Sequence, residues 1–311
     1  MEEIIRWITS EDVSFYTRVW RNETLPPKAI IFLVHGSVEH GGRYKAFAEH
    51  LTQQGYVVVA PDLRGHGETG IHGDGLGYFS DAPMGWEICV HDLKVIYDQC
   101  VDWYPGLPLI VFGHSMGSYL VRCFIKEYPV AMQGVVLSGT GHFATGIGDL
   151  ALGLSKVLMH TKGKRYKSRF LTSLVYGTLN KRIGKTETDF DFLSRDTEQV
   201  RRYIEDPLCG YICTVDYLHE MLFGTKKANR AAMFELANRQ LPLLLISGGE
   251  DPVADRGGKG FKKVFDSYKH RMDDVTAHVY EGARHEVLNE TNRETVMADI
   301  CAWLKTIEKY K

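Results

Sequence analysis

A serine flanked by two glycines is the first feature of the sequence that could do chemistry. Residues 113–117 read Gly-His-Ser-Met-Gly, and they directly follow the apolar run 109–112 and precede a helix-compatible segment. A strand, a tight turn and a helix in this order hold the nucleophile of a G-x-S-x-G motif, whereas a chance Gly-Ser-Gly turn needs no such neighbours. A side chain in place of either glycine would collide with neighbouring backbone, and the following helix points its N-terminal amides at the serine, which favours an oxyanion there. We therefore predict Ser115 as the nucleophile.

A serine hydroxyl is a weak nucleophile, so the motif requires a histidine base and an acid that orients it, in the chain order serine, acid, histidine. Three histidines follow the last strong apolar run: His270 in a charged helical stretch, His278 within an alternating strand, and His285 in the loop after that strand. A side chain just past the carboxyl end of a strand can reach the serine turn. His285 is therefore the predicted base.

The acid is expected after the apolar run 241–246, where residues 248–252 read Gly-Gly-Glu-Asp-Pro. Asp251 is the preferred acid, because the following proline fixes the turn and the short side chain holds an imidazole rigidly. Glu250 is expected to face solvent, and Asp255 is the reserve. The other location for such an acid, residues 139–144, contains no carboxylate.

An oxyanion hole needs two backbone N–H donors. One donor is expected from Met116, the residue after the nucleophile. The second is expected from Ser37 in the loop His35-Gly36-Ser37, which follows the apolar run 30–34. Gly36 would allow a close backbone approach, and the hydroxyl of Ser37 is expected to be incidental.

Other polar clusters have weaker cases for a function. His35, His40, His66 and His114 lie near the motif loops, but they lack the spacing of metal ligands. We expect them to make structural hydrogen bonds, and no metal or cofactor is implied. Residues 62–67 (Asp-Leu-Arg-Gly-His-Gly) resemble a phosphate-binding loop without its defining residues, so a buried polar turn is expected.

The elements that must position these residues follow from hydrophobic periodicity. Short apolar runs predict buried strands at 30–34, 56–60, 109–112, 135–137, 241–246 and 275–280. Helical periodicity recurs at 44–51, 86–97 and 296–307. Parallel strands need crossover connections, so this alternation predicts an α/β fold with a mostly parallel central sheet flanked by helices.

The alternation breaks between residues 141 and 223, which predicts an inserted helical cap on a core of residues 1–140 and 224–311. One predicted helical face of this cap is apolar and consists of Ile147, Leu150, Ala151, Leu154, Val157 and Leu158. Basic residues follow it at Lys162, Lys164, Arg165, Lys167 and Arg169. Two interpretations remain: a flap that touches anionic lipid surfaces, or a helix packed on the core followed by solvated charges.

The composition excludes several classes of protein. The chain has 311 residues, a net charge of −2, 44% hydrophobic and 24% charged residues, which is typical of a globular protein and excludes collagen-like and disordered chains. Near-neutral charge argues against a nucleic-acid binder and favours small-molecule partners. Neither a signal-length apolar segment nor a run of about 20 apolar residues is present, so a cytoplasmic location is expected. The six scattered cysteines lack a C-x-x-C pair and are expected to be reduced thiols.

With these residues in view, the chain resembles the monoacylglycerol lipase and lysophospholipase branch of the α/β-hydrolase superfamily, which also includes serine-aminopeptidase-like members. The resemblance spans most of the chain. It rests on VHGSVEHGGRY at 34–44, YVVVAPDLRGHGET at 56–69, FGHSMGS at 112–118, SGGEDPVAD at 247–255, GARHEVLNE at 282–290 and, within the cap, LSRDTEQVRRYIEDPL at 193–208.

The resemblance implies an α/β-hydrolase fold and a pocket for a lipid ester. In this family the residues matching Glu39, Arg43 and Tyr203 would line a polar pocket for a glycerol-like leaving group. The apolar residues of the cap would accept the acyl chain.

Together these observations predict a carboxylic ester hydrolase that forms an acyl-enzyme on Ser115, with monoacylglycerol or lysophospholipid as substrate. A serine in this turn argues against haloalkane dehalogenase and epoxide hydrolase chemistry, which use an aspartate nucleophile. Two alternatives remain: an aminopeptidase or amidase with the same triad, because a fold does not determine the scissile bond, and a ligand-binding protein without turnover.

Overall fold

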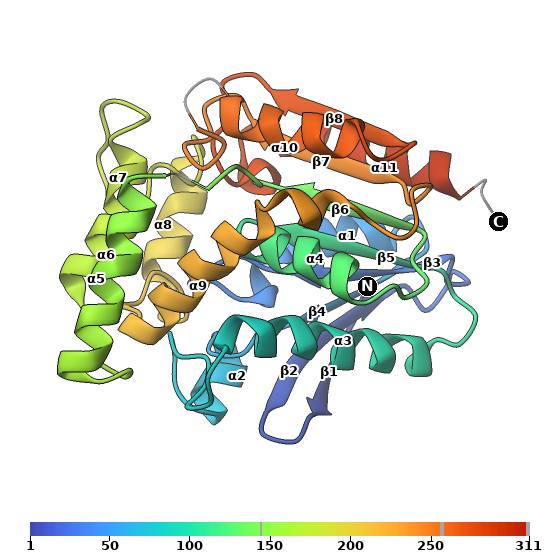
Figure 1. Cartoon of the computed structure of the whole chain (residues 1–311). Helices are drawn as coiled ribbons and strands as arrows, with labels where there is room; N and C mark the ends of the chain where they lie inside the picture. The colour runs from blue at the N-terminus through green and yellow to red at the C-terminus, as the bar shows by residue number, and fades with distance from the viewer. Residues whose placement is uncertain (144, 256–257, 309–311) are drawn as a thin grey trace.

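The computed structural model describes residues 1–143, 145–255 and 258–308, and one eight-stranded sheet forms its centre (Figure 1). The strands lie in the order β1-β2-β4-β3-β5-β6-β7-β8. From β4 across to β8 all neighbours are parallel, whereas β1 pairs antiparallel with β2 and β2 with β4. The prediction of an α/β fold with a mostly parallel sheet is confirmed.

The strands span β1 (Glu2–Thr9), β2 (Ser14–Arg21), β3 (Ala29–Val34), β4 (Tyr56–Pro61), β5 (Leu109–His114), β6 (Gly134–Ser138), β7 (Leu243–Gly248) and β8 (Val275–Tyr280). Every residue of β3, β4, β5, β6 and β7 is buried. Strands that are covered on both faces read as continuous apolar runs, which explains why the sequence reveals them.

Helices cover both faces of this sheet. They are η1 (Gly41–Tyr44), α1 (Lys45–Thr52), α2 (Gly67–His72), α3 (Gly85–Trp103), α4 (Met116–Glu127), η2 (Ala231–Phe234), α10 (Lys259–Lys269), η4 (Val287–Asn289) and α11 (Arg293–Ile307). In β3, Ile31 and Leu33 pack in one apolar cluster with residues of α1 and α11, whereas Phe32 and Val34 pack in the other with residues of α3, α4 and α10. The alternation of side chains along a strand thus supplies both cores.

The segment between β6 and β7 is helical within the described residues. It contains α5 (Ile147–Lys162), α6 (Arg169–Val175), α7 (Gly177–Asn180), α8 (Thr197–Glu205) and α9 (Val215–Ala228). Figure 1 shows α5 to α8 gathered beside the sheet, while α9 runs back toward it. Residue 223, the expected end of the cap, falls inside α9, whose buried residues share a cluster with those of α3 and α4. None of the described helices has the length and apolar character needed to cross a membrane.

Candidate active site

Ser115 occupies a strained turn between β5 and α4. Its backbone has φ +48° and ψ −121°, a conformation that non-glycine residues rarely adopt. A Cβ at Gly117 would lie 2.2 Å from the carbonyl oxygen of Val34, and one at Gly113 would lie 2.8 Å from that of Gly117. The Ser115 N–H donates to the carbonyl of Ser138 on β6 at 2.9 Å. Both glycines are therefore required by close backbone packing, and the turn exposes Ser115 to the cavity described below.

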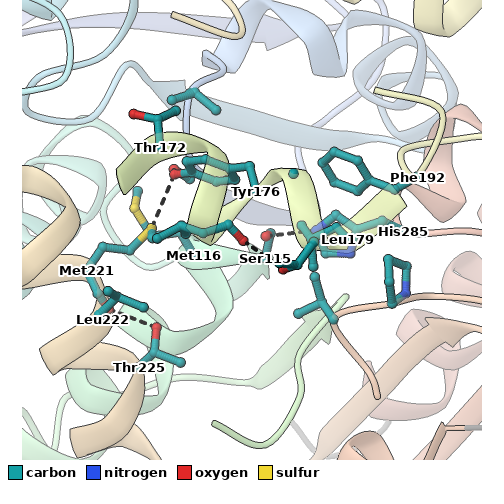
Figure 2. A pocket seen from close by; sticks show the side chains of 18 of the residues that line it. Ser115, Met116, Thr172, Tyr176, Leu179, Phe192, Met221, Leu222, Thr225 and His285 are labelled. Atoms are coloured by element: carbon teal, nitrogen blue, oxygen red, sulfur yellow. Dashed lines mark hydrogen bonds between the residues drawn. The ribbon is translucent and has the colours of Figure 1, made fainter. Parts of the chain in front are cut away.

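The structure brings Ser115, His285 and Asp251 together. Nε2 of His285 lies 2.8 Å from Oγ of Ser115, and Nδ1 of His285 lies 3.0 Å from each carboxylate oxygen of Asp251. An ionised carboxylate only accepts, so Nδ1 carries the proton and Nε2 presents its lone pair to the serine. Figure 2 shows Ser115 and His285 side by side among the residues that line a pocket. The arrangement can transfer the serine proton to the imidazole.

Each partner of this contact shifts the pKa of the other. Burial acts to lower the pKa of His285, but the charge and hydrogen bond of Asp251, together with the charges of Glu286 and Glu39, raise it above its usual value. Burial acts to raise the pKa of Asp251, and the interactions with His285 nevertheless lower it. The neighbouring ring of His114, 4.9 Å away between centroids, stays neutral because burial lowers its pKa to about 3. The raised pKa makes neutral His285 a stronger base, and the carboxylate of Asp251 can stabilise the imidazolium that forms when it takes a proton.

The alternatives considered for the base and acid lie elsewhere. Among the described residues, neither His270 nor His278 lines the cavity at Ser115. Glu250 is exposed, as expected. Asp255 lines the outer part of the cavity, where it lies 3.7 Å from Arg182, whereas Asp251 is 2% exposed and contacts the imidazole.

The two expected oxyanion donors flank Ser115. Among the described residues, neither the N–H of Ser37 nor that of Met116 donates to a protein acceptor. His35 Nδ1 donates to the carbonyl of Gly36 at 2.8 Å, and the N–H of Leu63 donates to His35 Nε2 at 2.9 Å. Because C=O and N–H lie on opposite edges of a trans peptide, this contact turns the Ser37 N–H away from His35. Two unpaired amides are thus available to a ligand beside the serine.

The hydroxyl of Ser37, in contrast, is not incidental. Ser37 Oγ lies 2.5 Å from the hydroxyl of Tyr176, between α6 and α7, and 2.6 Å from that of Tyr217 in α9. The sequence analysis missed both tyrosines, because no local pattern connects them with residue 37. They join the loop after β3 to the helical segment between β6 and β7.

Two of the three residues expected at the polar end of the pocket line the cavity. Glu39 and Tyr203 line the cavity, whereas Arg43 is not among its lining residues. Arg43 lies behind, because its guanidinium donates to Glu39 Oε2 at 2.5 Å and to both oxygens of Glu286 at 2.5 and 2.7 Å. The ring of Tyr203 stacks on the guanidinium, 4.8 Å away. Arg43, expected to line the polar pocket, thus lies behind Glu39 and Glu286 and holds their two carboxylates, and a role for it toward the leaving group stays a prediction.

Glu286 is a third residue that the sequence analysis missed. It lines the cavity and directly follows His285, a position that could have marked it as a neighbour of the base. Burial acts to raise its pKa, but Arg43 lowers the value to about 2, so the side chain is ionised. Burial raises the pKa of Glu39, which shares the same guanidinium. The site therefore carries ionised Glu286 close to the base.

A cavity of about 660 Å³ opens above Ser115. Its floor comes from the loops after β3 and β5, and its walls come largely from α6, α7, α9 and the segment before α8. Figure 2 shows Leu179, Phe192, Met221 and Leu222 around the serine. This volume and apolar lining suit a small or medium-sized apolar ligand.

One group of possible metal ligands occurs in the described part of the chain: His40, Asp206 and Cys209. His40 Nδ1 accepts from the N–H of Gly42 at 3.2 Å, so Nε2 carries a proton and donates to Asp206 at 2.9 Å. Burial also raises the pKa of the Cys209 thiol. These protonation states oppose metal binding, and the contact instead ties the loop after β3 to the helical segment. All six cysteines are free and buried.

Comparisons with known proteins agree with this geometry. A family model described as serine aminopeptidase, S33, matches residues 25–292. The chain is 30% identical over 295 residues to a monoacylglycerol lipase of Mycolicibacterium smegmatis, covering 92% of this chain and 91% of that protein. It is 28% identical over 307 residues to the monoglyceride lipase of Homo sapiens, covering 97% and 90%.

A solved structure shares the fold. A highly thermostable carboxyl esterase from Bacillus coagulans, in complex with glycerol, superposes with a TM-score of 0.90 at 24% identity, over 99% of both chains. The predicted resemblance to the monoacylglycerol lipase branch is confirmed by these matches. The chain thus belongs to the serine aminopeptidase S33 family, has the α/β-hydrolase fold, and is a carboxylic ester hydrolase similar to monoacylglycerol lipases.

Proposed function

We propose that this enzyme hydrolyses lipid esters through an acyl-enzyme on Ser115, with monoacylglycerol or lysophospholipid as substrate. The observation that carries the proposal is the continuous contact from Asp251 through His285 to Ser115, at 3.0 and 2.8 Å, beneath an apolar cavity. The relatives named as monoacylglycerol and monoglyceride lipases support a lipid ester as the substrate class.

In the proposed mechanism Oγ of Ser115 attacks the acyl carbonyl while His285 Nε2 takes its proton. Asp251 stabilises the resulting imidazolium, and the amides of Ser37 and Met116 bind the oxyanion. The imidazolium then protonates the alcohol oxygen, and the alcohol leaves. Water gives a proton to His285, attacks the acyl-enzyme, and the proton returns to Ser115 as the carboxylic acid is released.

The cavity suggests how a lipid ester would lie. Its apolar walls would hold the acyl chain, and its polar end at Glu39 and Tyr203 would hold the hydroxyls of the leaving group. Arg43 would act indirectly there by fixing Glu39 and Glu286. Such a division between one apolar and one polar end matches a substrate with a single acyl chain and a hydroxylated head group.

We further propose that residues 141–223 act as a cap with a transient membrane contact. The predicted apolar face of α5 splits: Ala151 is buried, whereas Leu150 is 63% and Val157 is 58% exposed. Of the basic residues, Arg165 pairs with Asp74 and Asp81. Exposed apolar residues next to Lys162, Lys167 and Arg169 favour contact with an anionic lipid surface. The cytoplasmic location expected from the sequence stays a prediction.

The test of the proposed function is a Ser115→Ala variant. We expect its turnover of p-nitrophenyl and monoacylglycerol esters to fall by roughly four to six orders of magnitude, and its labelling by a fluorophosphonate probe to vanish. Ser267→Ala, on the outer helix α10, is the matched control and should behave as wild type. Equal labelling of Ser115→Ala and wild type would refute the nucleophile.

A substrate panel separates the remaining alternatives. Monoacylglycerols and lysophospholipids of increasing chain length are compared with aminoacyl anilides, because the family model carries the name of an aminopeptidase. Faster anilide hydrolysis would favour the peptidase alternative, and a folded wild type without turnover on any of them would favour a ligand-binding role. A preference for acetyl esters over longer chains would contradict the lipid assignment.

A further inference from the structure

The hydroxyl of Tyr217 contacts both residues whose amides are expected to bind the oxyanion. Tyr217 lies in the first turn of α9 and is fully buried. Its Oη is 2.6 Å from Oγ of Ser37 and 3.3 Å from Sδ of Met116. It is also 2.9 Å from Nε2 of His66. A residue 180 positions after Ser37 thus reaches both sides of the expected hole.

The hydrogen bonds around Tyr217 have a defined direction. Nδ1 of His66 lies 2.9 Å from the carbonyl of Arg64, which only accepts, so Nδ1 carries the proton and Nε2 accepts from Tyr217. Burial lowers the pKa of His66 to about 4, which keeps the ring neutral at neutral pH. The oxygen of Tyr217 can then accept from Ser37, and Ser37 from Tyr176. This chain of hydrogen bonds runs through Tyr217 and His66 and ends at the backbone carbonyl of Arg64, in the buried turn at 62–67.

The loop that receives this support is strained. Val38, next to Ser37, has φ +51°, which is unfavourable for a β-branched residue and persists only where surrounding contacts hold it. Its carbonyl accepts from the hydroxyl of Tyr203 at 3.0 Å and from the N–H of Gly210 at 2.9 Å. Without such partners the loop could relax, and the amide of Ser37 would change direction.

We propose that Tyr217 is a positioning residue for the oxyanion hole: its hydroxyl donates to His66, accepts from Ser37 and packs against Sδ of Met116, so that the backbone amides of Ser37 and Met116 converge on the acyl oxygen. It acts through those two residues and not on the substrate. The inference rests on the proposed function, and it gives a role to the polar turn at 62–67, which the sequence singled out without one.

The experiment is a Tyr217→Phe variant, which removes the hydroxyl and keeps the ring that packs on Phe79 at 4.5 Å between centroids. Loss of a whole oxyanion donor typically costs about 100 to 1,000-fold in turnover, and a misplaced donor should cost less. We expect kcat for a p-nitrophenyl ester to fall by roughly 10 to 100-fold with KM nearly unchanged, because the oxyanion exists only beyond the ground state.

A transition-state analogue adds a readout that a merely structural role would not change. A trifluoromethyl ketone forms a tetrahedral oxyanion on the serine, so its inhibition constant should rise by the same factor as kcat falls. Tyr97→Phe is the matched control: this tyrosine is buried in α3, and its hydroxyl donates to a backbone carbonyl, that of Ala131, at 2.5 Å. It should retain wild-type kcat and inhibition even if its thermal stability drops equally.

Ser37→Ala provides the second variant, because it breaks the same contact and leaves the backbone amide in place. If the two hydroxyls act in one chain, the double variant should lose little more than the more affected single variant. The inference would be overturned if the losses of kcat in the two single variants multiplied in the double variant, or if only KM rose. It would also be overturned if both single variants had the same kcat as Tyr97→Phe. Should Tyr217→Phe fail to fold, the same criteria apply to Ser37→Ala.

Ser115→Ala, measured in parallel, keeps the two failures apart. If Ser115→Ala stays active, the proposed function itself fails. If Ser115→Ala is inactive while Tyr217→Phe and Ser37→Ala retain full kcat and inhibitor affinity, the proposed function stands and only the positioning role is refuted.

Discussion

The two regions that enclose the cavity, the sheet core below it and the helical segment between β6 and β7 around it, are built in different ways. In α4, which carries the nucleophile turn, ten of 12 residues are buried, whereas in α5 three of 16 are buried. The core holds its site residues by close packing on both sheet faces, which leaves them little room to move. Within the segment between β6 and β7, α9 packs on α3 and α4, whereas the parts around α7 and α8 meet the core through polar contacts such as Ser37 with Tyr176 and His40 with Asp206. The predicted catalytic residues thus lie in the closely packed core, and much of the apolar lining of the cavity lies in the less buried segment.

A substitution in the proposed triad, on the core side of the cavity, should have the largest effect on activity. In Asp251→Asn the carboxylate can no longer hold the Nδ1 proton or balance the imidazolium, and we expect kcat to fall by about 10⁴-fold with the fold retained. Steady-state kinetics with a p-nitrophenyl ester measure this. Glu250→Gln, one residue away and exposed, is the control and should behave as wild type. Nearly full activity in Asp251→Asn would remove Asp251 from the mechanism.

Changing the outer helix should affect surface binding and leave the chemistry intact. Replacing Leu150 and Val157 together by Glu puts two charges where apolar side chains are exposed. Each apolar side chain contributes about 1.5 kcal/mol or more when it enters lipid, so binding to anionic vesicles should weaken by at least roughly 100-fold. Hydrolysis of a short soluble ester should stay unchanged. Ile5→Glu, at an exposed position on β1, is the control, and equal vesicle binding by all variants would refute the membrane contact.

The smallest expected effect lies in the pH dependence. In the proposed mechanism the neutral form of His285 is the base, so kcat/KM should fall as the pH drops through its pKa. Burial acts to lower this pKa, but Asp251 and, to a lesser extent, Glu286 raise it. Protonated His285 stabilises the fold below its unfolded pKa, and this contribution is lost as the pH rises through the raised folded value. Glu286→Gln removes one negative charge, so the acidic limb of the profile should move to lower pH.

Profiles of kcat/KM for Glu286→Gln and for the exposed control Glu281→Gln test this point. A limb that stays in place, or that moves to higher pH, would contradict the electrostatic role of Glu286. A shift shared by both variants would show a general charge effect instead.

The success of sequence-based prediction follows the same division between regions. The buried strands and the turn around Ser115 can be recognised locally, because burial on both faces gives continuous apolar runs and close backbone packing leaves no room for a Cβ at Gly113 or Gly117. The β1–β2 hairpin was not predicted. Along β1 the side chains alternate between half-buried and exposed and include Glu2, Glu3 and Arg6, so no apolar run marks the strand.

Contacts between distant segments could not be predicted from local patterns. The sequence suggested Glu39, Arg43 and Tyr203 only through family resemblance, and the structure shows Arg43 engaged by Glu39 and Glu286. The partners of Ser37 lie 139 and 180 residues away. Such pairs depend on how the insertion folds over the sheet, which no spacing rule specifies.

The start of α9 has a consequence for engineering. Thr214 donates both its N–H, at 2.9 Å, and its hydroxyl, at 2.6 Å, to the carbonyl of Gly77 in the core, and Tyr217 follows within one turn. In a chimera that exchanges the cap of this enzyme for that of a relative, the exchanged segment should therefore end before residue 214. A graft that crosses this point would replace the tyrosine that braces Ser37, and a change meant to alter chain-length preference would then also slow the chemical step.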